Sequence, residues 1–258
     1  MNTRIAITNQ KGGVAKTTTA VNLADGLQRL GRSVLLVDSD PQANATSHLG
    51  IDRKRLRKTM DNLYYEADLD ISEVLISRNG FTGLDVLPAG EPLAYAEQKL
   101  SGVPVKEKLL SERLAEIEGN YDYIIIDCPP NLGFLTMNAL VAATDMLVVI
   151  KPEYFALEGL MRISQKAEMI KQRINPDLNL SGYLLANYDG RKNQHKAIRK
   201  AVKEKFPGKL FQTIIRTNAR LSNATSQGQT IFEYDPKSHG ATDYRNLSTE
   251  VEERYGRR

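Results

Sequence analysis

The sequence is poor in the residues that build metal centres and disulfide-stabilised folds. Among its 258 residues there is a single cysteine, Cys128. One thiol per chain excludes an intrachain disulfide and any iron–sulfur or zinc site that takes several thiolates from one subunit. The three histidines, at positions 48, 195 and 239, are scattered without the spacing of metal ligands.

Long apolar runs are also missing. The longest runs, such as residues 146–150, are far shorter than the roughly 20 residues of a membrane-spanning helix. The N-terminus leads straight into a strand-like segment, without the basic start and apolar core of a secretory signal. We therefore expect a cytoplasmic protein with no membrane span. With 41% hydrophobic and 26% charged residues, the chain has the composition of a folded globular domain.

Short apolar runs typical of strands recur along the chain, separated by segments with helical periodicity. Several runs are apolar on consecutive residues, as in strands that are buried on both faces. The sequence therefore predicts an α/β fold with a doubly wound, mostly parallel sheet flanked by helices. No linker or repeat divides the chain, so we expect residues 1–258 to form a single domain. The expected strands are residues 4–8, 33–37, 84–87, 121–126, 146–150, 181–185 and 211–215.

A glycine-rich segment lies between the first predicted strand and the first predicted helix. Residues 9–18 read Asn-Gln-Lys-Gly-Gly-Val-Ala-Lys-Thr-Thr. Such a turn aims backbone N–H groups and the positive end of a helix at an anion. We expect Lys16 to contact the β- and γ-phosphates of a nucleotide and the Thr17 hydroxyl to ligate Mg²⁺. The alternative is a surface turn rich in glycine and lysine, because Gln10 and Ala15 replace two glycines of the general pattern.

Aspartates follow two of the predicted strands. Asp38 and Asp40 come after residues 33–37, and Asp127 comes after residues 121–126. In an open parallel sheet, ligands bind where the strands have their carboxyl ends. Each aspartate alone could be a capping or loop residue, but the three together favour a site at that edge.

The run Lys11-Gly12-Gly13-Val14-x-Lys16-Thr17 resembles the deviant Walker A loop of the ParA/MinD superfamily. Residues 34–42 and 123–130 resemble two further segments of that family, the second being its Walker B strand. The resemblance identifies the fold as a P-loop NTPase of the deviant Walker A type, with ATP and Mg²⁺ as cofactors. The nucleotide contacts that it implies are Lys11, Gly12, Gly13, Val14, Ala15, Lys16, Thr17, Thr18, Asn187 and Asn218.

The same resemblance implies roles for individual residues. Lys11 would reach across a dimer interface to the phosphate of the other subunit's nucleotide, and Lys16 would hold phosphate in its own subunit. Asp38 would position the attacking water. The metal site would comprise Thr17, Asp40 and Asp127. The four residues expected in catalysis are Lys11, Lys16, Asp38 and Asp127.

Positive charge is concentrated in one part of the chain, with ten basic residues and one acidic residue between positions 191 and 220. A helix expected at about residues 193–205 would carry four of the basic residues on one face. Such a row of like charges is easiest to understand if it binds a polyanion, and its lack of aromatics favours non-specific contacts to DNA phosphates. A solvated surface helix is the alternative. The predicted DNA contacts are Lys196, Arg199, Lys200, Lys203, Arg216 and Arg220.

The resemblance as a whole implies a ParA-type partition ATPase with weak basal activity. ATP would hold two subunits in a sandwich homodimer that binds DNA without sequence specificity. A ParB-like or other adaptor protein would stimulate hydrolysis and release the DNA, distributing a plasmid, chromosome or other cargo over the nucleoid. The chain would be cytoplasmic and nucleoid-associated. Because it begins at the first strand, we expect no N-terminal helix-turn-helix domain.

Two other functions fit parts of the sequence. A metabolic P-loop enzyme, such as a ligase or kinase resembling dethiobiotin synthetase, would use the same phosphate loop on a small molecule. A membrane-cycling positioning ATPase is disfavoured because residues 242–255 contain few large apolar residues and several acids. We expect that segment to form a helix packed on its own domain.

Overall fold

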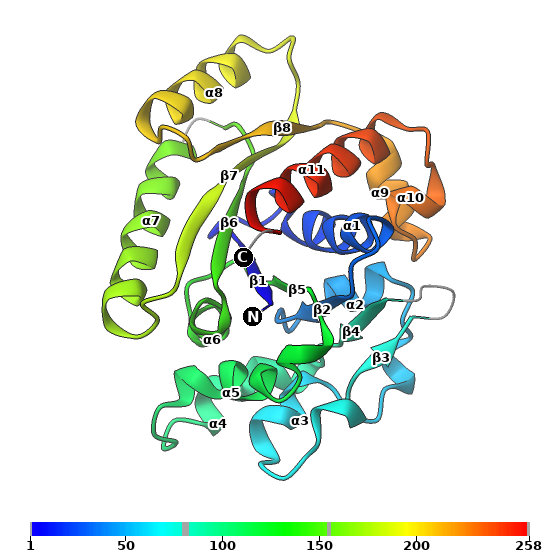
Figure 1. Cartoon of the computed structure of the whole chain (residues 1–258), viewed down its shortest axis with the longest axis vertical. Coiled ribbons are helices and arrows are strands. Elements are labelled where there is room, and N and C mark those ends of the chain that lie inside the picture. Colours follow the sequence, from blue (N-terminus) through cyan, green and yellow to red (C-terminus); the bar gives the residue numbers. More distant parts are fainter. Residues whose placement is uncertain (1, 79–82, 154–155, 257–258) are drawn as a thin grey trace.

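The computed structural model describes residues 2–78, 83–153 and 156–256 (Figure 1). An eight-stranded sheet runs through this part of the chain in the order β3-β4-β2-β5-β1-β6-β7-β8. Its neighbouring strands are parallel except for β3 and β4, which pair antiparallel. The strands are β1 (Thr3–Thr8), β2 (Val34–Asp38), β3 (Ile76–Ser77), β4 (Leu84–Leu87), β5 (Tyr123–Asp127), β6 (Asp145–Ile150), β7 (Asn179–Tyr188) and β8 (Leu210–Arg216).

Helices cover both faces of the sheet, which confirms the doubly wound α/β prediction (Figure 1). One face is covered by α1 (Lys16–Arg29), α2 (Asn44–His48), α9 (Ala219–Ser226), α10 (Ile231–Tyr234) and α11 (His239–Tyr255). The other is covered by α3 (Met60–Tyr65), α4 (Ala96–Lys99), α5 (Leu109–Ala115), α6 (Phe134–Ala142), α7 (Ala156–Arg173) and α8 (Asn193–Lys205). Single 3₁₀ turns are η1 (Arg53–Arg55), η2 (Ile71–Glu73), η3 (Glu91–Tyr95), η4 (Lys106–Lys108) and η5 (Glu118–Asn120).

The central strands explain why consecutive residues are apolar. In β5, Ile124 and Ile126 belong to the core beneath α5, α6 and α7, whereas Ile125 belongs to the core beneath α1 and α11. Successive side chains of a strand point to opposite faces, and both faces here are covered. Each of these isoleucines is fully buried, and burial of one such side chain stabilises the fold by about 1.5–3 kcal/mol.

Helix α1 ends close to where its sequence pattern predicts. Gly31 adopts a left-handed φ of 84°, and its N–H donates to the carbonyl of Gln28. Glycine is favoured there because it has no Cβ to clash with the backbone. Leu30, the residue that follows the last helical turn, is 44% exposed.

The C-terminal segment packs on its own domain, as predicted. Tyr244, Leu247, Val251 and Tyr255 of α11 are all buried in the core shared with α1. In the part of the chain that the structure describes, no helix combines the length and apolar character needed to span a bilayer.

Candidate functional site

A cleft of about 630 Å³ opens at the carboxyl edge of the sheet. Its walls come from four parts of the chain that are distant in sequence. The first is the glycine-rich loop with the start of α1, and the second is the segment that follows β2. The third is the segment after β5, which contributes Pro130, and the fourth joins the ends of β7 and β8 to α9. The lining residues are Gly12, Gly13, Ala15, Lys16, Thr17, Thr18, Asp40, Gln42, Asn44, Ser47, His48, Pro130, Asn187, Ile215, Asn218, Leu221, Ser222 and Thr225.

The glycine-rich loop forms the wall at the N-terminus of α1. Gly13 and Ala15 both adopt left-handed backbone angles, with φ of 70° and 73°, and Lys16 is the first residue of the helix. Lys16 is only 7% exposed, and burial lowers the pKa of its ammonium while Asp127 and Asp40 oppose that shift. The cleft therefore receives a helix N-terminus and a buried cation, which together suit a phosphate group.

Two of the predicted nucleotide contacts differ from the others in position. The side chain of Val14 is buried in the core at 2% exposure, so this residue can offer a ligand only its backbone. Lys11 does not line the cleft, because its ammonium pairs with the carboxylate of Glu153. Six predicted contacts of the loop lie on the cleft wall, namely Gly12, Gly13, Ala15, Lys16, Thr17 and Thr18.

Asn187 and Asn218 stand on another wall of the cleft, and their contact with a nucleotide stays a prediction. Asn187 has a left-handed φ of 53°, next to an irregularity in the pairing of β7 and β8. Asn218 caps α9, and its side-chain oxygen accepts a hydrogen bond from the Arg220 N–H. With Ile215 and Leu221 between these amides, the wall offers apolar surface and polar groups to a flat ring system.

Asp127 is a buried carboxylate in need of a partner. It is fully buried at the end of β5, and neither of its oxygens has a hydrogen-bond partner within the structure. Burial raises the pKa of Asp127 well above its usual range, and the neighbouring Asp38 adds to this shift. The Thr17 hydroxyl lies close enough to act on the same pKa. Thr17 and Lys16 oppose this shift. A buried carboxylate that these two groups compensate only in part fits a divalent cation.

Within residues 2–78, 83–153 and 156–256, no three His, Cys, Asp or Glu side chains are grouped so as to hold a metal ion alone. Magnesium at phosphate sites typically takes one or two side chains and completes its shell with phosphate and water. Thr17 and Asp127, with Asp40 on the cleft wall, match that kind of site.

The two aspartates after β2 occupy different positions. Asp38 is fully buried, and its carboxylate accepts hydrogen bonds from the Thr46 N–H at 2.8 Å, the Thr46 hydroxyl at 2.7 Å and the Asp40 N–H at 3.2 Å. Asp40 lines the cleft. Asp38 does not line the cleft, and its role in positioning the attacking water stays a prediction. Asp40 offers its carboxylate at the cleft wall.

Glu153 joins two lysines at the rim of the cleft. One of its oxygens accepts from the Lys11 ammonium, and the other lies 2.7 Å from the Lys151 ammonium. These contacts, that of Lys11 first, lower the pKa of Glu153 to about 2. The loop is fixed nearby by Asn9, whose amide donates to the carbonyl of Val149 at 2.6 Å. Sequence reasoning did not single out Glu153, although its place two residues after Lys151 could have indicated an ion pair between them.

His48 is a second residue of the cleft that sequence reasoning missed, because nothing in its spacing marks it. It is 1% exposed, and its Nε2 lies 3.2 Å from the hydroxyl of Thr225 on α9. Burial lowers the pKa of His48 to about 4. The ring is therefore neutral at physiological pH and can act as a hydrogen-bonding wall of the cleft.

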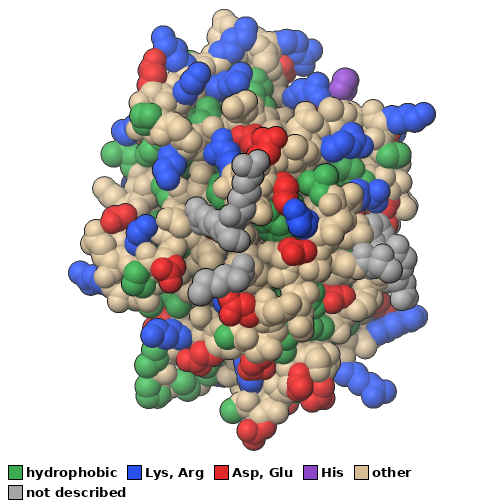
Figure 2. All heavy atoms as spheres, in the orientation of Figure 1, with side chains coloured by type: hydrophobic (Ala, Val, Ile, Leu, Met, Phe, Trp, Pro, Cys, Tyr) green, Lys and Arg blue, Asp and Glu red, His purple; other side chains and the backbone are tan. Residues whose placement is uncertain are grey.

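The basic helix is where the sequence predicts it. Helix α8 spans Asn193–Lys205, with Ile198 and Val202 buried against the core. Figure 2 shows Lys and Arg side chains gathered at the end of the molecule that Figure 1 assigns to α8. The exposed row on its outer face consists of Lys196, Arg199, Lys200 and Lys203.

Arg216 and Arg220 are less available than the residues of α8. Arg216 donates to the Asp243 carboxylate through both its Nε and Nη2 atoms, at 3.0 and 2.6 Å. Arg220 lies 3.5 Å from a carboxylate oxygen of Asp235. Each guanidinium already contacts a carboxylate, so a bound polyanion would have to compete with that carboxylate for the arginine.

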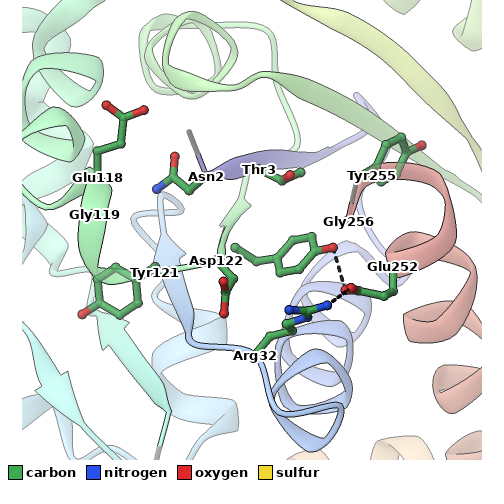
Figure 3. A pocket seen from close by; sticks show the side chains of 11 residues that line it. Asn2, Thr3, Arg32, Glu118, Gly119, Tyr121, Asp122, Glu252, Tyr255 and Gly256 are labelled. Atoms are coloured by element: carbon green, nitrogen blue, oxygen red, sulfur yellow. Dashed lines mark hydrogen bonds and ion pairs between the residues drawn. The ribbon is translucent and has the colours of Figure 1, made fainter. Parts of the chain in front are cut away.

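A second, smaller pocket of about 230 Å³ lies at the amino edge of the sheet (Figure 3). Inside it Glu252 of α11 accepts hydrogen bonds from Arg32 and from the Tyr123 hydroxyl, the latter at 2.8 Å. Glu118 pairs with Arg4 at 3.7 Å. These charges compensate one another. The pocket therefore lies at the contact between α11 and the sheet, and it is distinct from the cleft.

Comparisons with known proteins agree with this geometry. A family model described as an AAA domain matches residues 2–180. The sporulation initiation inhibitor protein Soj of Bacillus subtilis is 44% identical over 247 residues, covering 96% of this chain and 97% of the relative. The chromosome partitioning protein ParA of Myxococcus xanthus is 43% identical over 253 residues, covering 97% of this chain and 88% of the relative.

A solved structure shares the fold across the whole chain. It is a cobyrinic acid a,c-diamide synthase from Mycobacterium smegmatis with bound ADP and magnesium. The TM-score is 0.85 at 34% identity, covering 100% of this chain and 97% of that one. With the phosphate loop, the cleft aspartates and these full-length relatives in agreement, the chain belongs to the ParA-type partition ATPases of the P-loop NTPase fold.

Proposed function

We propose that this chain is an ATP-driven switch that binds DNA as a homodimer and releases it after hydrolysis. The observation that carries the proposal is that one chain combines a cleft suited to a nucleotide with a helix, α8, whose exposed face bears four basic residues.

Nucleotide binding would use the groups that the cleft presents. Lys16 and the backbone of residues 12–18 would hold the phosphates, and Asn187 and Asn218 would face the base. Thr17, Asp127 and Asp40 would hold Mg²⁺, which supplies charge neutralisation at the phosphates when bound. Asp40, on the cleft wall, is a further candidate for orienting the attacking water. Asp38 would support it from beneath.

Dimerisation would move Lys11 from one carboxylate to another anion. In the monomer its ammonium pairs with Glu153, and that pair is largely exposed, at 59% for Lys11 and 37% for Glu153. Exposed ion pairs contribute about 0–1 kcal/mol, so the triphosphate of a second subunit is a strong competitor. The resulting sandwich dimer would present two copies of α8 on one surface.

The row of Lys196, Arg199, Lys200 and Lys203 would contact DNA phosphates without reading bases. Among the described residues, the carboxylate of this helix that pairs with the row is Glu204, 3.8 Å from Lys200. An adaptor protein that stimulates hydrolysis would then convert nucleotide turnover into release of DNA and movement of a cargo. Arg216 and Arg220 would join the DNA face as secondary contacts.

The proposal is tested by retention of the protein on a non-specific DNA duplex with ATP, ADP or no nucleotide, at two salt concentrations. Sizing of the protein under the same nucleotide conditions runs in parallel. With ATP, but not with ADP or without nucleotide, we expect the protein to form a dimer and to be retained on DNA in a salt-sensitive way. A protein that stays monomeric with ATP and ignores DNA would contradict the proposal.

A second candidate is an ATP-dependent ligase or kinase acting on a small molecule, and the synthase that shares the fold favours it. The partition proteins are more similar in sequence, at 43–44% against 34% identity. The retention experiment separates the two functions. A metabolic enzyme would hydrolyse ATP or transfer its phosphate, and it would not be retained on DNA.

A further inference from the structure

Asp38 is the point at which the loop after β2 is fastened to the sheet. Its Oδ2 accepts both the N–H and the hydroxyl of Thr46, eight residues further along the chain on α2, at 2.8 and 2.7 Å. Its Oδ1 accepts the N–H of Asp40 at 3.2 Å. Three donors from one segment thus converge on a single buried carboxylate, with Asp38 and Thr46 both fully buried.

Thr46 carries this connection further, to the next strand of the sheet. Its hydroxyl donates to Asp38 and at the same time accepts the N–H of Ala89, just after β4, at 3.2 Å. The hydroxyl therefore uses its donor and one acceptor position on groups that water cannot reach. We name this connection of Asp38, Thr46 and Ala89 the clasp.

The segment held by the clasp forms one wall of the cleft. Asp40, Gln42, Asn44, Ser47 and His48 all line it. The carboxylate of Asp40 accepts the Gln42 N–H at 2.9 Å, so the position of one follows that of the other. The next residue, Ala43, has a left-handed φ of 51°, which an alanine adopts only when its surroundings hold it there.

We propose that Thr46 is a positioning residue for ATP hydrolysis, acting through Asp38 to hold Asp40 against the nucleotide. The inference rests on the proposed function for the reaction that it serves. In this arrangement Asp38, the buried carboxylate at the end of β2, fixes the loop, and Asp40, the carboxylate of that loop, contacts the ligand. Reaction rates are sensitive to such placement, since a misplacement of about 1 Å can cost on the order of 100-fold in rate.

Three variants test the proposal. Thr46→Val keeps the shape of the side chain and removes the hydroxyl, and Thr46→Ser restores the hydroxyl. Thr230→Val is the matched control, because Thr230 is also fully buried and its hydroxyl also donates to a buried aspartate, Asp25, but outside the cleft. We measure kcat and KM for ATP, and hydrogen exchange of the amides in residues 38–48.

For Thr46→Val we expect kcat to fall roughly 10- to 100-fold with KM changed less than about threefold, and Thr46→Ser to recover most of the rate. Amide exchange at Asp40 and Thr46 should speed up in Thr46→Val and stay unchanged in Thr230→Val. If Thr46 had only a structural role, Thr46→Val and Thr230→Val would both lose stability and would not differ in kcat. That result would overturn the proposal.

The result also separates this inference from the proposed function. If the parent protein hydrolyses ATP and Thr46→Val does so at the same rate, the positioning role is wrong and the proposed function stands. If the parent protein does not hydrolyse ATP, the proposed function is wrong, and so is the positioning role in hydrolysis. Exchange that stays unchanged in Thr46→Val would refute the clasp itself.

Discussion

The ammonium of Lys11 is held by the carboxylate of Glu153, which lies 142 residues further along the chain and also pairs with Lys151. A lysine of the phosphate loop is thus occupied within its own subunit. The pair is exposed, so it is weak in free energy, but it fixes where the lysine points.

Glu153→Gln should therefore favour the ATP-bound dimer. The substitution removes the carboxylate that pairs with Lys11 and Lys151. The triphosphate of a second subunit then no longer competes with Glu153 for the Lys11 ammonium. We expect the dimer dissociation constant with ATP to fall several-fold, up to about fivefold for a pair worth at most about 1 kcal/mol. Sedimentation or sizing across protein concentrations measures it.

The matched control is Glu158→Gln, which breaks another exposed pair, with Arg162 on α7, at 2.5 Å. It should leave the dimer constant as in the parent protein. A weaker dimer in Glu153→Gln would show instead that Glu153 supports the assembly.

Ala15→Gly should stabilise the fold. Ala15 has a left-handed φ of 73°, a conformation in which a Cβ costs about 1–2 kcal/mol. Part of that gain is offset because glycine is more flexible in the unfolded chain, so we expect a net increase of roughly 0.5–1 kcal/mol in the free energy of unfolding. Denaturant melts measure it, and a loss of stability would show that the alanine methyl makes compensating contacts.

His48 should contribute a loss of stability in mild acid, against the opposite contribution of Asp38, whose pKa burial raises to about 6. Burial lowers the pKa of His48 from 6.5 to about 4, so between these values the unfolded chain binds more protons than the folded one. The contribution of His48 is therefore complete above pH 7 and is lost as pH falls toward 4, by up to about 3 kcal/mol. Urea melts at several pH values measure this slope.

Compared with the parent protein, His48→Gln should lose less stability between pH 6.5 and 4, since glutamine does not titrate. His239 is exposed on α11, so His239→Gln serves as the control and should keep the parent slope. An identical slope in all three proteins would mean that other groups cause the acid sensitivity.

The proposed DNA contacts of α8 are tested by charge removal. Arg199→Gln should weaken retention on every duplex sequence alike and reduce the slope of log affinity against log salt by about 0.9, the value for one phosphate contact. Lys108→Gln is the control, because Lys108 is exposed near α5, at the other end of the molecule from α8 (Figure 1). Equal salt slopes for Arg199→Gln and the parent protein would place the DNA contacts elsewhere.

Local patterns predicted much of the structure. The bounds of α8 and the buried face of α11 follow from periodicity over neighbouring residues, and the phosphate loop follows from its glycines and Lys16. Residues 53–80 could not be placed from sequence. Where the structure describes them they contain short turns, a six-residue helix and the two-residue strand β3, too short to leave a periodic pattern.

The aspartates show where sequence reasoning stops. The pattern places Asp38, Asp40 and Asp127 at one edge of the sheet, and the structure agrees. Which of them meets a ligand depends on hydrogen-bond donors from Thr46, eight residues away from Asp38, and on burial by neighbouring elements. The family resemblance suggested Asp38 for the attacking water, which stays a prediction, and the structure adds Asp40 as a candidate because it lines the cleft.

By itself, the sequence determined the doubly wound fold, the phosphate loop and the basic face of α8, because each depends on the order of residues within one segment. The tertiary structure decided which side chains meet across segments: Glu153 with Lys11, Asp243 with Arg216, and Thr46 with Asp38. These pairings depend on how strands and loops distant in the chain are brought together. Charge and hydrogen-bond complementarity then selects among residues that look equivalent in the sequence.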